Sequence, residues 1–308
     1  MRRLREVYHA LRGAPPVTGF YVAFMSLKCA LEDAGYEVRV NDFALARKNP
    51  GYPIGITGYP HILDGWSLPN PAVLGPGLLD HPAIAPSLMD DPRYKTYVCS
   101  CEWHRRFFAK TYGDKCVTWF AGIDVDAWPD FHGEPKDIDF IIYDKVRWNR
   151  EELSRKLTEP IQSELRRRGY TSELIRYRHH DHVQYRATLR RARGMIFLAE
   201  HETQRLAYQE AMACGVPILA WDQGLWLDPM RLQFDGADIP ASSVPYFGPQ
   251  CGERFKDADA FPAALDRFFE ARERYAPRAF VIENLSRKAS AETYLQRYAS
   301  AGQMKLPL

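Results

Sequence analysis

The sequence predicts an α/β protein of two Rossmann-like domains, whose parallel sheets face each other across a cleft. Its 308 residues suit two units of about 150 residues each. Helical periodicity alternates with short apolar runs along the chain, which is typical of parallel-sheet architecture. A polar segment containing proline and glycine, Asp126–Asp137 (DAWPDFHGEPKD), separates two such series and predicts the domain boundary.

The composition is that of a soluble globular protein, with 46% apolar and 26% charged residues. A net charge of +2 gives no electrostatic reason to expect nucleic acid as a partner. No apolar run approaches the roughly 20 residues that span a bilayer. The amino-terminal stretch lacks the apolar core of a signal peptide. The six cysteines form no CxxC pair, so we expect neither disulfides nor zinc, and a cytoplasmic location.

The first domain is expected to span residues 1–128. Its first helix, Phe20–Ala34, begins after Gly19 and ends at Gly35, since glycine suits the left-handed position that terminates a helix. Short apolar runs predict strands at 5–11, Tyr36–Asn41, Pro53–Thr57, Ala72–Leu74, Thr96–Ser100 and Cys116–Phe120.

The second domain is expected to span residues 129–283, and residues 284–308 to form a helix that packs back on the first domain. The run MIFLA has no polar face, which indicates a central strand covered on both sides. Predicted strands are Ile138–Tyr143, Glu173–Arg178, Met195–Ala199 and Ile218–Trp221, and predicted helices are Arg150–Arg168, Val183–Arg193, Gln204–Cys214, Asp259–Tyr275 and Ser290–Tyr298.

The segment Phe197–Ile218 (FLAEHETQRLAYQEAMACGVPI) carries the most chemistry. A buried strand leads into a short polar loop, and a helix with Thr203 as N-cap then runs to Gly215. Free N–H groups and the helix dipole would make its beginning an anion site, for which a diphosphate is a suitable ligand.

Glu202 and Glu210 are eight residues apart in this segment. A helix would separate them by about 12 Å, comparable to the distance between the sugar and the ribose of a nucleotide sugar. Two such carboxylates would accept hydrogen bonds from hydroxyls on both sugars. On spacing alone, the alternative is a capping acid and an exposed helix residue.

The pattern E-T-x-x-L-x-x-x-E-A-M-A-C-G-V-P-I resembles the donor-site signature of retaining GT-B glycosyltransferases of family 4, with Glu202 and Glu210 as its Glu-x7-Glu pair. The segment Tyr97–Trp128 is similar to the end of that family's first domain, through Ser100 and the turn Gly122–Asp124. The region from Gly19 to Gly35 fits the family's glycine loop and first helix more loosely.

The resemblance implies retaining transfer of a sugar from a nucleotide-diphosphate sugar, which is a substrate, with no cofactor and no metal. Glu202 would contact the transferred sugar and Glu210 the ribose hydroxyls. Basic residues after the first strand of the second domain would meet the diphosphate, because cations neutralise phosphate. The basic candidates are Lys145, Arg147 and Arg150, and further donor contacts are expected from Thr203, Gln204, Arg205, Leu206 and Gly19.

Arg205 replaces the family's usual glycine and adds a cation near the phosphates or the acceptor. The family also places a histidine of the first domain against the donor sugar. His81 and His61 both follow apolar runs, and His81 is favoured because its strand precedes the one ending at Ser100. For each histidine, a purely structural role is the alternative.

Two metal-like patterns are discounted. Asp124–Asp126 forms a DxD but lies in the turn before the linker, and the ligand-type residues of His179–His182 are consecutive, not spaced along one helix face. The acceptor is a hydroxyl on a glycan, a lipid-linked molecule or a small molecule; a lipid-linked acceptor would favour peripheral membrane contact through basic runs. A nucleotide-sugar epimerase or hydrolase, or a non-catalytic binding module, remains an alternative.

Overall fold

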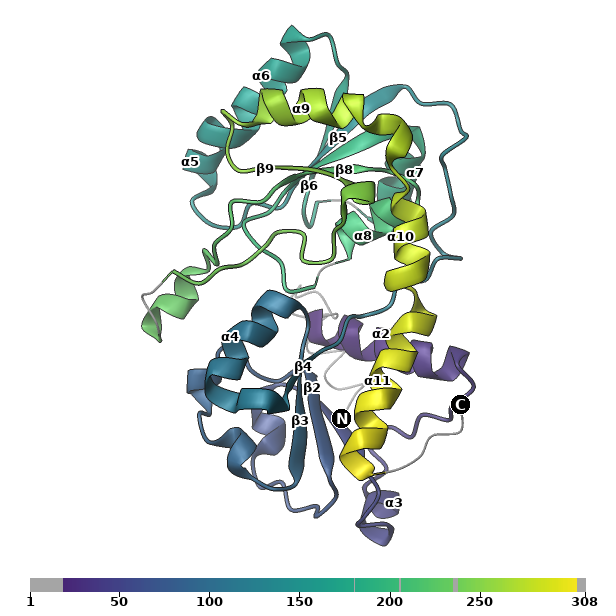
Figure 1. The fold of residues 1–308 in the computed structure, drawn as a ribbon, viewed down its shortest axis with the longest axis vertical. Coiled ribbons are helices and arrows are strands. Elements are labelled where there is room, and N and C mark those ends of the chain that lie inside the picture. Colours follow the sequence, from purple (N-terminus) through teal and green to yellow (C-terminus); the bar gives the residue numbers. More distant parts are fainter. Residues whose placement is uncertain (1–18, 180, 205, 235–237, 304–308) are drawn as a thin grey trace, which may run out of the picture.

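The computed structural model describes residues 19–179, 181–204, 206–234 and 238–303. Two α/β domains are stacked along its long axis (Figure 1). Each contains a parallel sheet, which confirms the predicted fold class. In the first domain the strand order is β1-β2-β3-β4, with β1 Ile54–Gly58, β2 Ala72–Gly77, β3 Tyr94–Cys99 and β4 Cys116–Thr118.

The prediction of a strand at Tyr36–Asn41 is wrong, because this segment pairs with none of the described strands. None of its residues is buried: Tyr36 and Val38 are half-buried and Val40 is 44% exposed, so its apolar side chains do not enter a core. The strand predicted at 5–11 lies outside the described residues.

Helix α2 (Gly19–Asp33) covers one side of the first sheet together with α11 (Arg287–Gly302), and the two helices lie side by side in Figure 1. Leu27, Trp119 and Tyr294 share one buried cluster at this contact. The indole of Trp119 donates to the carbonyl of Ser290 at 3.1 Å. Helix α11, near the last of the described residues, thus packs on the first domain. Among the described residues of this domain, the other α-helices are α3 Phe43–Lys48 and α4 Glu102–Tyr112.

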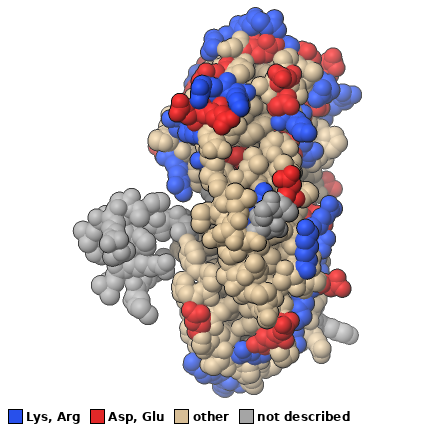
Figure 2. All heavy atoms as spheres, turned by 90° about the vertical axis from the view of Figure 1, so that its left-hand side faces the viewer, with Lys and Arg blue, Asp and Glu red and all other residues tan. Residues whose placement is uncertain are grey.

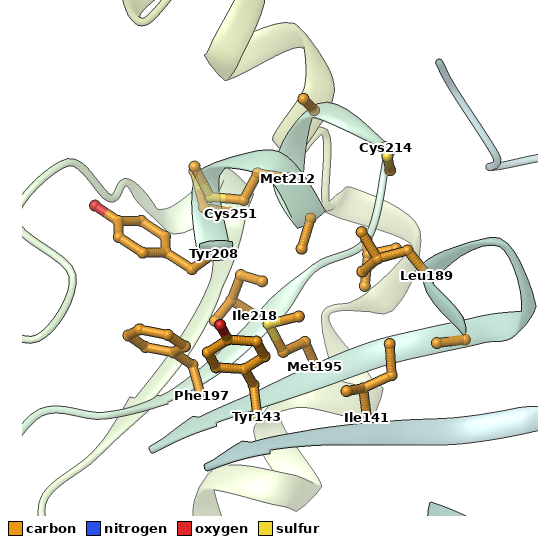
Figure 3. Packing of buried hydrophobic residues seen from close by; sticks show 14 of the residues in the cluster. Ile141, Tyr143, Leu189, Met195, Phe197, Tyr208, Met212, Cys214, Ile218 and Cys251 are labelled. Atoms are coloured by element: carbon orange, nitrogen blue, oxygen red, sulfur yellow. The ribbon is translucent and has the colours of Figure 1, made fainter. Parts of the chain in front are cut away.

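The second sheet has the order β6-β5-β7-β8-β9 and is parallel throughout. Its middle strands β5 and β7 are buried on both faces, as the apolar runs predict. Helices α7, α8 and α10 cover one face and build the cluster shown in Figure 3, whereas α6 (Glu159–Arg167) and α9 cover the other. The elements are β5 Ile138–Asp144, β6 Ser172–Arg176, α7 His182–Arg191, β7 Ala192–Leu198, α8 Ala207–Ala213, β8 Ile218–Trp221, β9 Gly252–Phe255, α9 Phe261–Glu270 and α10 Pro277–Asn284.

Two predicted helices differ from the structure. The helix expected over Arg150–Arg168 consists of α5 (Arg150–Leu153), a π-helical turn (Ser154–Thr158) and α6 (Glu159–Arg167). The helix expected from Gln204 begins only at Ala207, because the preceding residues form contacts outside their own segment. The N–H of Glu202 donates to Ser242, and the side chain of Gln204 pairs with the backbone of Ala121.

The connection from β8 to β9 reaches from the second domain to the first. We call residues 224–234 and 238–241 the β8–β9 arm; it projects beside α4 in Figure 1. Leu225 and Pro240 form an antiparallel bridge at its base. Trp226 is 7% exposed and packs on Phe107 in the core of the first domain. The second domain therefore contributes side chains to the core of the first.

Charged side chains of both signs gather at the two ends of the face in Figure 2, and its middle is mostly uncharged. Among the helices that the structure describes, none is both long and apolar enough to cross a membrane.

Candidate active site

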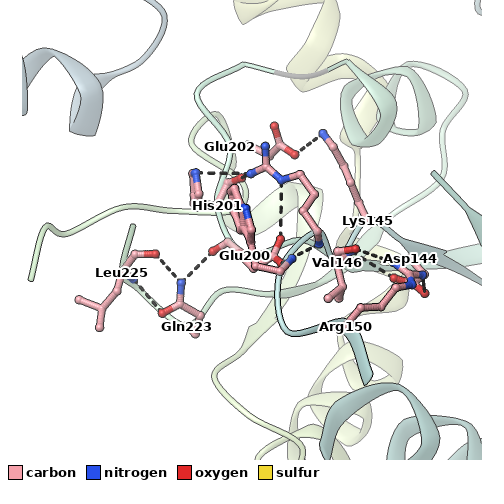
Figure 4. A network of polar contacts seen from close by, with 11 residues as sticks. Asp144, Lys145, Val146, Arg150, Glu200, His201, Glu202, Gln223 and Leu225 are labelled. Carbon is pink, nitrogen blue, oxygen red and sulfur yellow. Dashed lines mark hydrogen bonds and ion pairs between the residues drawn. The ribbon is translucent and has the colours of Figure 1, made fainter. Parts of the chain in front are cut away.

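Polar side chains follow the parallel strands β5, β7 and β8 at the edge where these strands end (Figure 4). Lys145 comes directly after β5, and its N–H donates to Leu198 at 2.8 Å, which extends the pairing with β7 by one residue. Side chains alternate along a strand. Lys145 therefore shares the α8 side of the sheet with Tyr143, and Asp144 lies on the opposite side with Val146.

Lys145 and Glu202 form an ion pair in the interior, with side chains 1% and 2% exposed. The ammonium also lies 5.0 Å from the ring centroid of Tyr177. Removing one member of such a pair leaves the other charge buried and uncompensated, which is strongly destabilising. This ion pair therefore joins the segment that follows β5 to the loop that follows β7.

Glu210 lies in α8 and is 7% exposed. Desolvation raises the pKa of its carboxyl to about 8, and the charge of Lys145 opposes this shift only in part. Lys145 thus acts on both glutamates of the predicted Glu-x7-Glu pair. A cation and two buried acids lie at the carboxyl edge of a parallel sheet, where ligands of such sheets bind.

A third buried acid, Glu200, joins the loops. Its Oε1 accepts the backbone N–H groups of Arg147 at 2.7 Å and Trp148 at 3.0 Å. Its carbonyl accepts from the side chain of Gln223, after β8, at 2.8 Å. One residue therefore connects the segments that follow three strands of the sheet (Figure 4).

The other two predicted cations do not lie with Lys145. The guanidinium of Arg147 lies 4.2 Å from the ring centroid of Trp148 and donates to the carbonyl of His201 at 3.2 Å. The Trp148 ring in turn stacks on His201 with centroids 5.3 Å apart. Arg150 pairs with Asp144 and donates to the carbonyl of Val146, so it lies on the opposite side of the sheet.

The residues predicted ahead of α8 have other contacts. Thr203 is not an N-cap, because Leu206 occupies that position. The side chain of Gln204 accepts from the N–H of Ala121 at 2.6 Å and donates to its carbonyl at 2.8 Å, across the domain boundary. The seven-residue α8 is too short to supply the anion site that the sequence suggested. Leu206 packs between two hydrophobic clusters, Arg205 lies outside the described residues, and Gly19 is the exposed first residue of α2.

His81 is 6% exposed and lies where the β8–β9 arm meets the first domain. Its ring stacks on Phe234 with centroids 4.7 Å apart and meets the edge of Phe107 at 4.9 Å. Its Nδ1 accepts the N–H of Ala83 at 3.1 Å. His61 is exposed and stacks on Tyr59. His81 is therefore the more enclosed of the two histidines, and its role stays a prediction.

The two metal-like patterns have structural contacts. Asp124 accepts the N–H groups of Asp126 and Ala127 and pairs with Arg287 at 2.9 Å. Asp181 caps α7 by accepting the N–H of Gln184 at 2.7 Å. Over the residues with described positions, no three His, Cys, Asp or Glu side chains gather as potential ligands of a metal ion.

The sequence pattern missed Glu200, Trp226 and Tyr246. Tyr246 donates to the carbonyl of Ser100 in the first domain at 2.6 Å. For Glu200 a signal was present, since an acid directly after a buried strand lies at the ligand-binding edge. Trp226 and Tyr246 follow β8 in a long irregular connection, where periodicity carries no information.

Comparison with known proteins identifies the fold. No protein-family profile matches the sequence, and no curated protein sequence is similar to it. The glycosyltransferase AviGT4, involved in avilamycin A biosynthesis, matches at 12% identity over 93% of this chain and 91% of its own, with a TM-score of 0.53.

Accessory secretory protein 1, 2 and 3 of Streptococcus pneumoniae also matches, at 12% identity and a TM-score of 0.54 over 91% of this chain. This chain spans 57% of that protein's length. TarM matches at 11% identity and a TM-score of 0.50 over 74% of this chain and 50% of its own. At such low identity these matches establish the fold alone: the chain has the GT-B architecture.

Proposed function

We propose that this protein is a retaining, metal-independent glycosyltransferase of the family 4 type, which transfers a sugar from a nucleotide-diphosphate sugar to an acceptor hydroxyl. The observation that carries the proposal is the buried Lys145, which pairs with Glu202 and acts on Glu210 at the carboxyl edge of the second sheet. A buried acid with a strongly shifted pKa and a specific charged neighbour is characteristic of functional sites.

The charges of this site suit a nucleotide sugar. The diphosphate is anionic and needs a cation, which Lys145 provides after β5. Glu202 would accept hydrogen bonds from hydroxyls of the transferred sugar, and Glu210 from the ribose. The similarity to AviGT4, a glycosyltransferase by its own description, supports this assignment at the level of the fold.

In the proposed reaction, the bond between the anomeric carbon and the β-phosphate oxygen breaks, and a bond to the acceptor oxygen forms on the same face of the sugar. The acceptor's hydroxyl proton passes to the departing nucleoside diphosphate. Lys145 would stabilise the negative charge that develops on this leaving group, replacing the metal ion used in other folds. Glu202 would hold the sugar in place during the transfer.

The experiment measures binding and transfer separately. UDP, GDP, ADP and dTDP are each tested for thermal stabilisation of the parent protein, since a ligand that binds only the native state raises its stability. The corresponding nucleotide sugars are then assayed for transfer. Glu202→Gln should abolish transfer and retain nucleoside diphosphate binding, whereas Glu210→Ala should weaken that binding.

Glu151→Ala is the matched control, because Glu151 is 91% exposed and lies outside this site. Equal and small effects of the two site variants would refute the assigned roles. Incubation with the donor alone distinguishes the rival activities: an epimerase or hydrolase turns the donor over rapidly without acceptor, and a transferase does so slowly.

A further inference from the structure

The loop after β5 directs consecutive backbone N–H groups at carboxylates of the protein itself. Val146 N–H donates to Oδ1 of Asp144 at 3.1 Å, and the next two N–H groups donate to Glu200, as described above. Successive N–H groups in a turn form a concave anion site. In this protein, acidic side chains occupy that site.

Glu200 is suited to hold this loop in one conformation. Its side chain is 1% exposed, and hydrogen bonds to an ionised acceptor are stronger than neutral ones. Its Oε2 has no hydrogen-bond partner among the described residues and lies 3.9 Å from Nε of Arg147. The carboxylate therefore interacts with both the backbone and the side chain of this loop.

The loop also carries Lys145. The N–H of Lys145 is fixed by Leu198 at the end of β7, and Glu200 follows two residues later on the same segment. The turn that begins at Lys145 is thus attached to the β7 segment at both of its ends. Glu202, the ion-pair partner of Lys145, is on that segment as well.

We propose that Glu200 is a positioning residue: it fixes the turn 145–148 and thereby places the Lys145 ammonium for the diphosphate of the donor. This inference rests on the proposed function for the identity of the ligand. The proposal gives Glu200 no contact with the substrate, because its Oε1 already accepts the N–H groups of Arg147 and Trp148. An opposite role is also testable, in which the Glu200 carboxylate competes with phosphate for these N–H groups.

Two variants separate positioning from other effects. Glu200→Gln keeps an acceptor oxygen for the two N–H groups and removes the charge, whereas Glu200→Ala removes both. Glu151→Ala is the control. Glu151 is close in sequence to the turn 145–148, and its replacement removes the same charge from an exposed side chain. All proteins are compared well below their unfolding temperatures, so that only the folded state is measured.

The first readout needs no ligand. Amide hydrogen exchange of residues 145–148 should be at least about tenfold faster in Glu200→Ala, because its two N–H groups lose their acceptor. In Glu200→Gln and Glu151→Ala it should stay close to that of the parent, with β8 as the internal reference. Unchanged exchange in Glu200→Ala would overturn the inference, whatever the protein's activity.

The second readout is the dissociation constant for UDP, GDP, ADP and dTDP. We expect binding about tenfold weaker in Glu200→Ala and mostly restored in Glu200→Gln, since a lost hydrogen bond to a charged group is worth about that factor. Tighter binding in Glu200→Ala would establish competition with phosphate and overturn positioning. Faster exchange with unchanged affinity would reduce Glu200 to a structural residue. If the parent binds none of the four, the proposed function fails, and the exchange result still decides whether Glu200 fixes the turn.

Discussion

Replacing Glu210 with glutamine removes a titrating group from the interior of the second domain with little change in shape. Burial raises the pKa of Glu210 from its ordinary value of 4.5 to about 8. Between these two pH values, the folded protein retains a proton that the unfolded chain releases. The free energy of unfolding therefore decreases as the pH rises through this window, because stability falls wherever the native state binds more protons.

The magnitude follows from the size of the shift. One pKa unit corresponds to about 1.4 kcal/mol, so the decrease amounts to about 3 kcal/mol between pH 4.5 and pH 7. It reaches on the order of 4–5 kcal/mol above pH 8, where Glu210 is ionised in both states. Glutamine does not titrate. The stability of Glu210→Gln relative to the parent should therefore increase by these amounts as the pH rises.

Urea unfolding of both proteins at about pH 5, 7 and 9 measures this difference. The comparison cancels the other titrating groups, which both proteins share. Glu151→Gln provides the control, since its exposed side chain should leave the pH profile parallel to that of the parent. Parallel profiles for Glu210→Gln and the parent would refute the reasoning, because they would show that Glu210 has the same pKa in the folded and unfolded states.

Three further experiments test the Lys145–Glu202 pair, the independence from metal and the close contact between Gly122 and α11. Lys145→Met leaves Glu202 buried without its cation and should reduce the free energy of unfolding by about 3–5 kcal/mol. The double variant Lys145→Met/Glu202→Gln should recover most of this loss. If urea unfolding shows that the losses of the two single variants add in the double variant, the two side chains do not stabilise each other. Transfer activity should persist in excess EDTA after metal stripping, and a loss restored by Mn²⁺ or Mg²⁺ would contradict the proposed metal-independent mechanism. Gly122→Ala brings a Cβ within 2.5 Å of Cα of Arg287 and should lower the free energy of unfolding, measured with urea, by about 1–3 kcal/mol. Gly133→Ala is the control and should leave this free energy unchanged, because its Cβ meets nothing within 4 Å.

Buried strands were the most predictable elements, because continuous apolar runs indicate burial on both faces. The bounds of β8, Ile218–Trp221, agree with the sequence prediction, and β7 was found from the run MIFLA. Strand β9 (Gly252–Phe255) was missed because it is an edge strand with the sequence GERF, which has two charged residues among four. Its pairing with β8 is a tertiary contact that no local pattern encodes.

The roles of the candidate site residues stay predictions, and the structure shows how these residues are arranged. Glu202 and Glu210 were expected at opposite ends of the donor, and the structure places Lys145 where its charge acts on both. Arg150 was a candidate for the same edge of the sheet, yet it pairs with Asp144 on the opposite side. The position of Glu200 directly after a buried strand was a signal for the ligand-binding edge, but its hydrogen-bond partners could not be predicted, because they are backbone N–H groups, which leave no trace in the sequence.

Side chains of both domains make contacts next to the candidate site. The indole of Trp103, in the first domain, donates to the carbonyl of Glu202 at 2.8 Å. The side chain of Gln204 holds the backbone of Ala121, and Tyr246 holds that of Ser100. These contacts join the first domain to the segment after β7, and the Lys145–Glu202 pair, to which that segment contributes Glu202, is buried. Exclusion of water strengthens every electrostatic interaction within the site. Contacts between the two domains therefore hold the segment that carries Glu202, and a pattern within one segment does not contain such contacts.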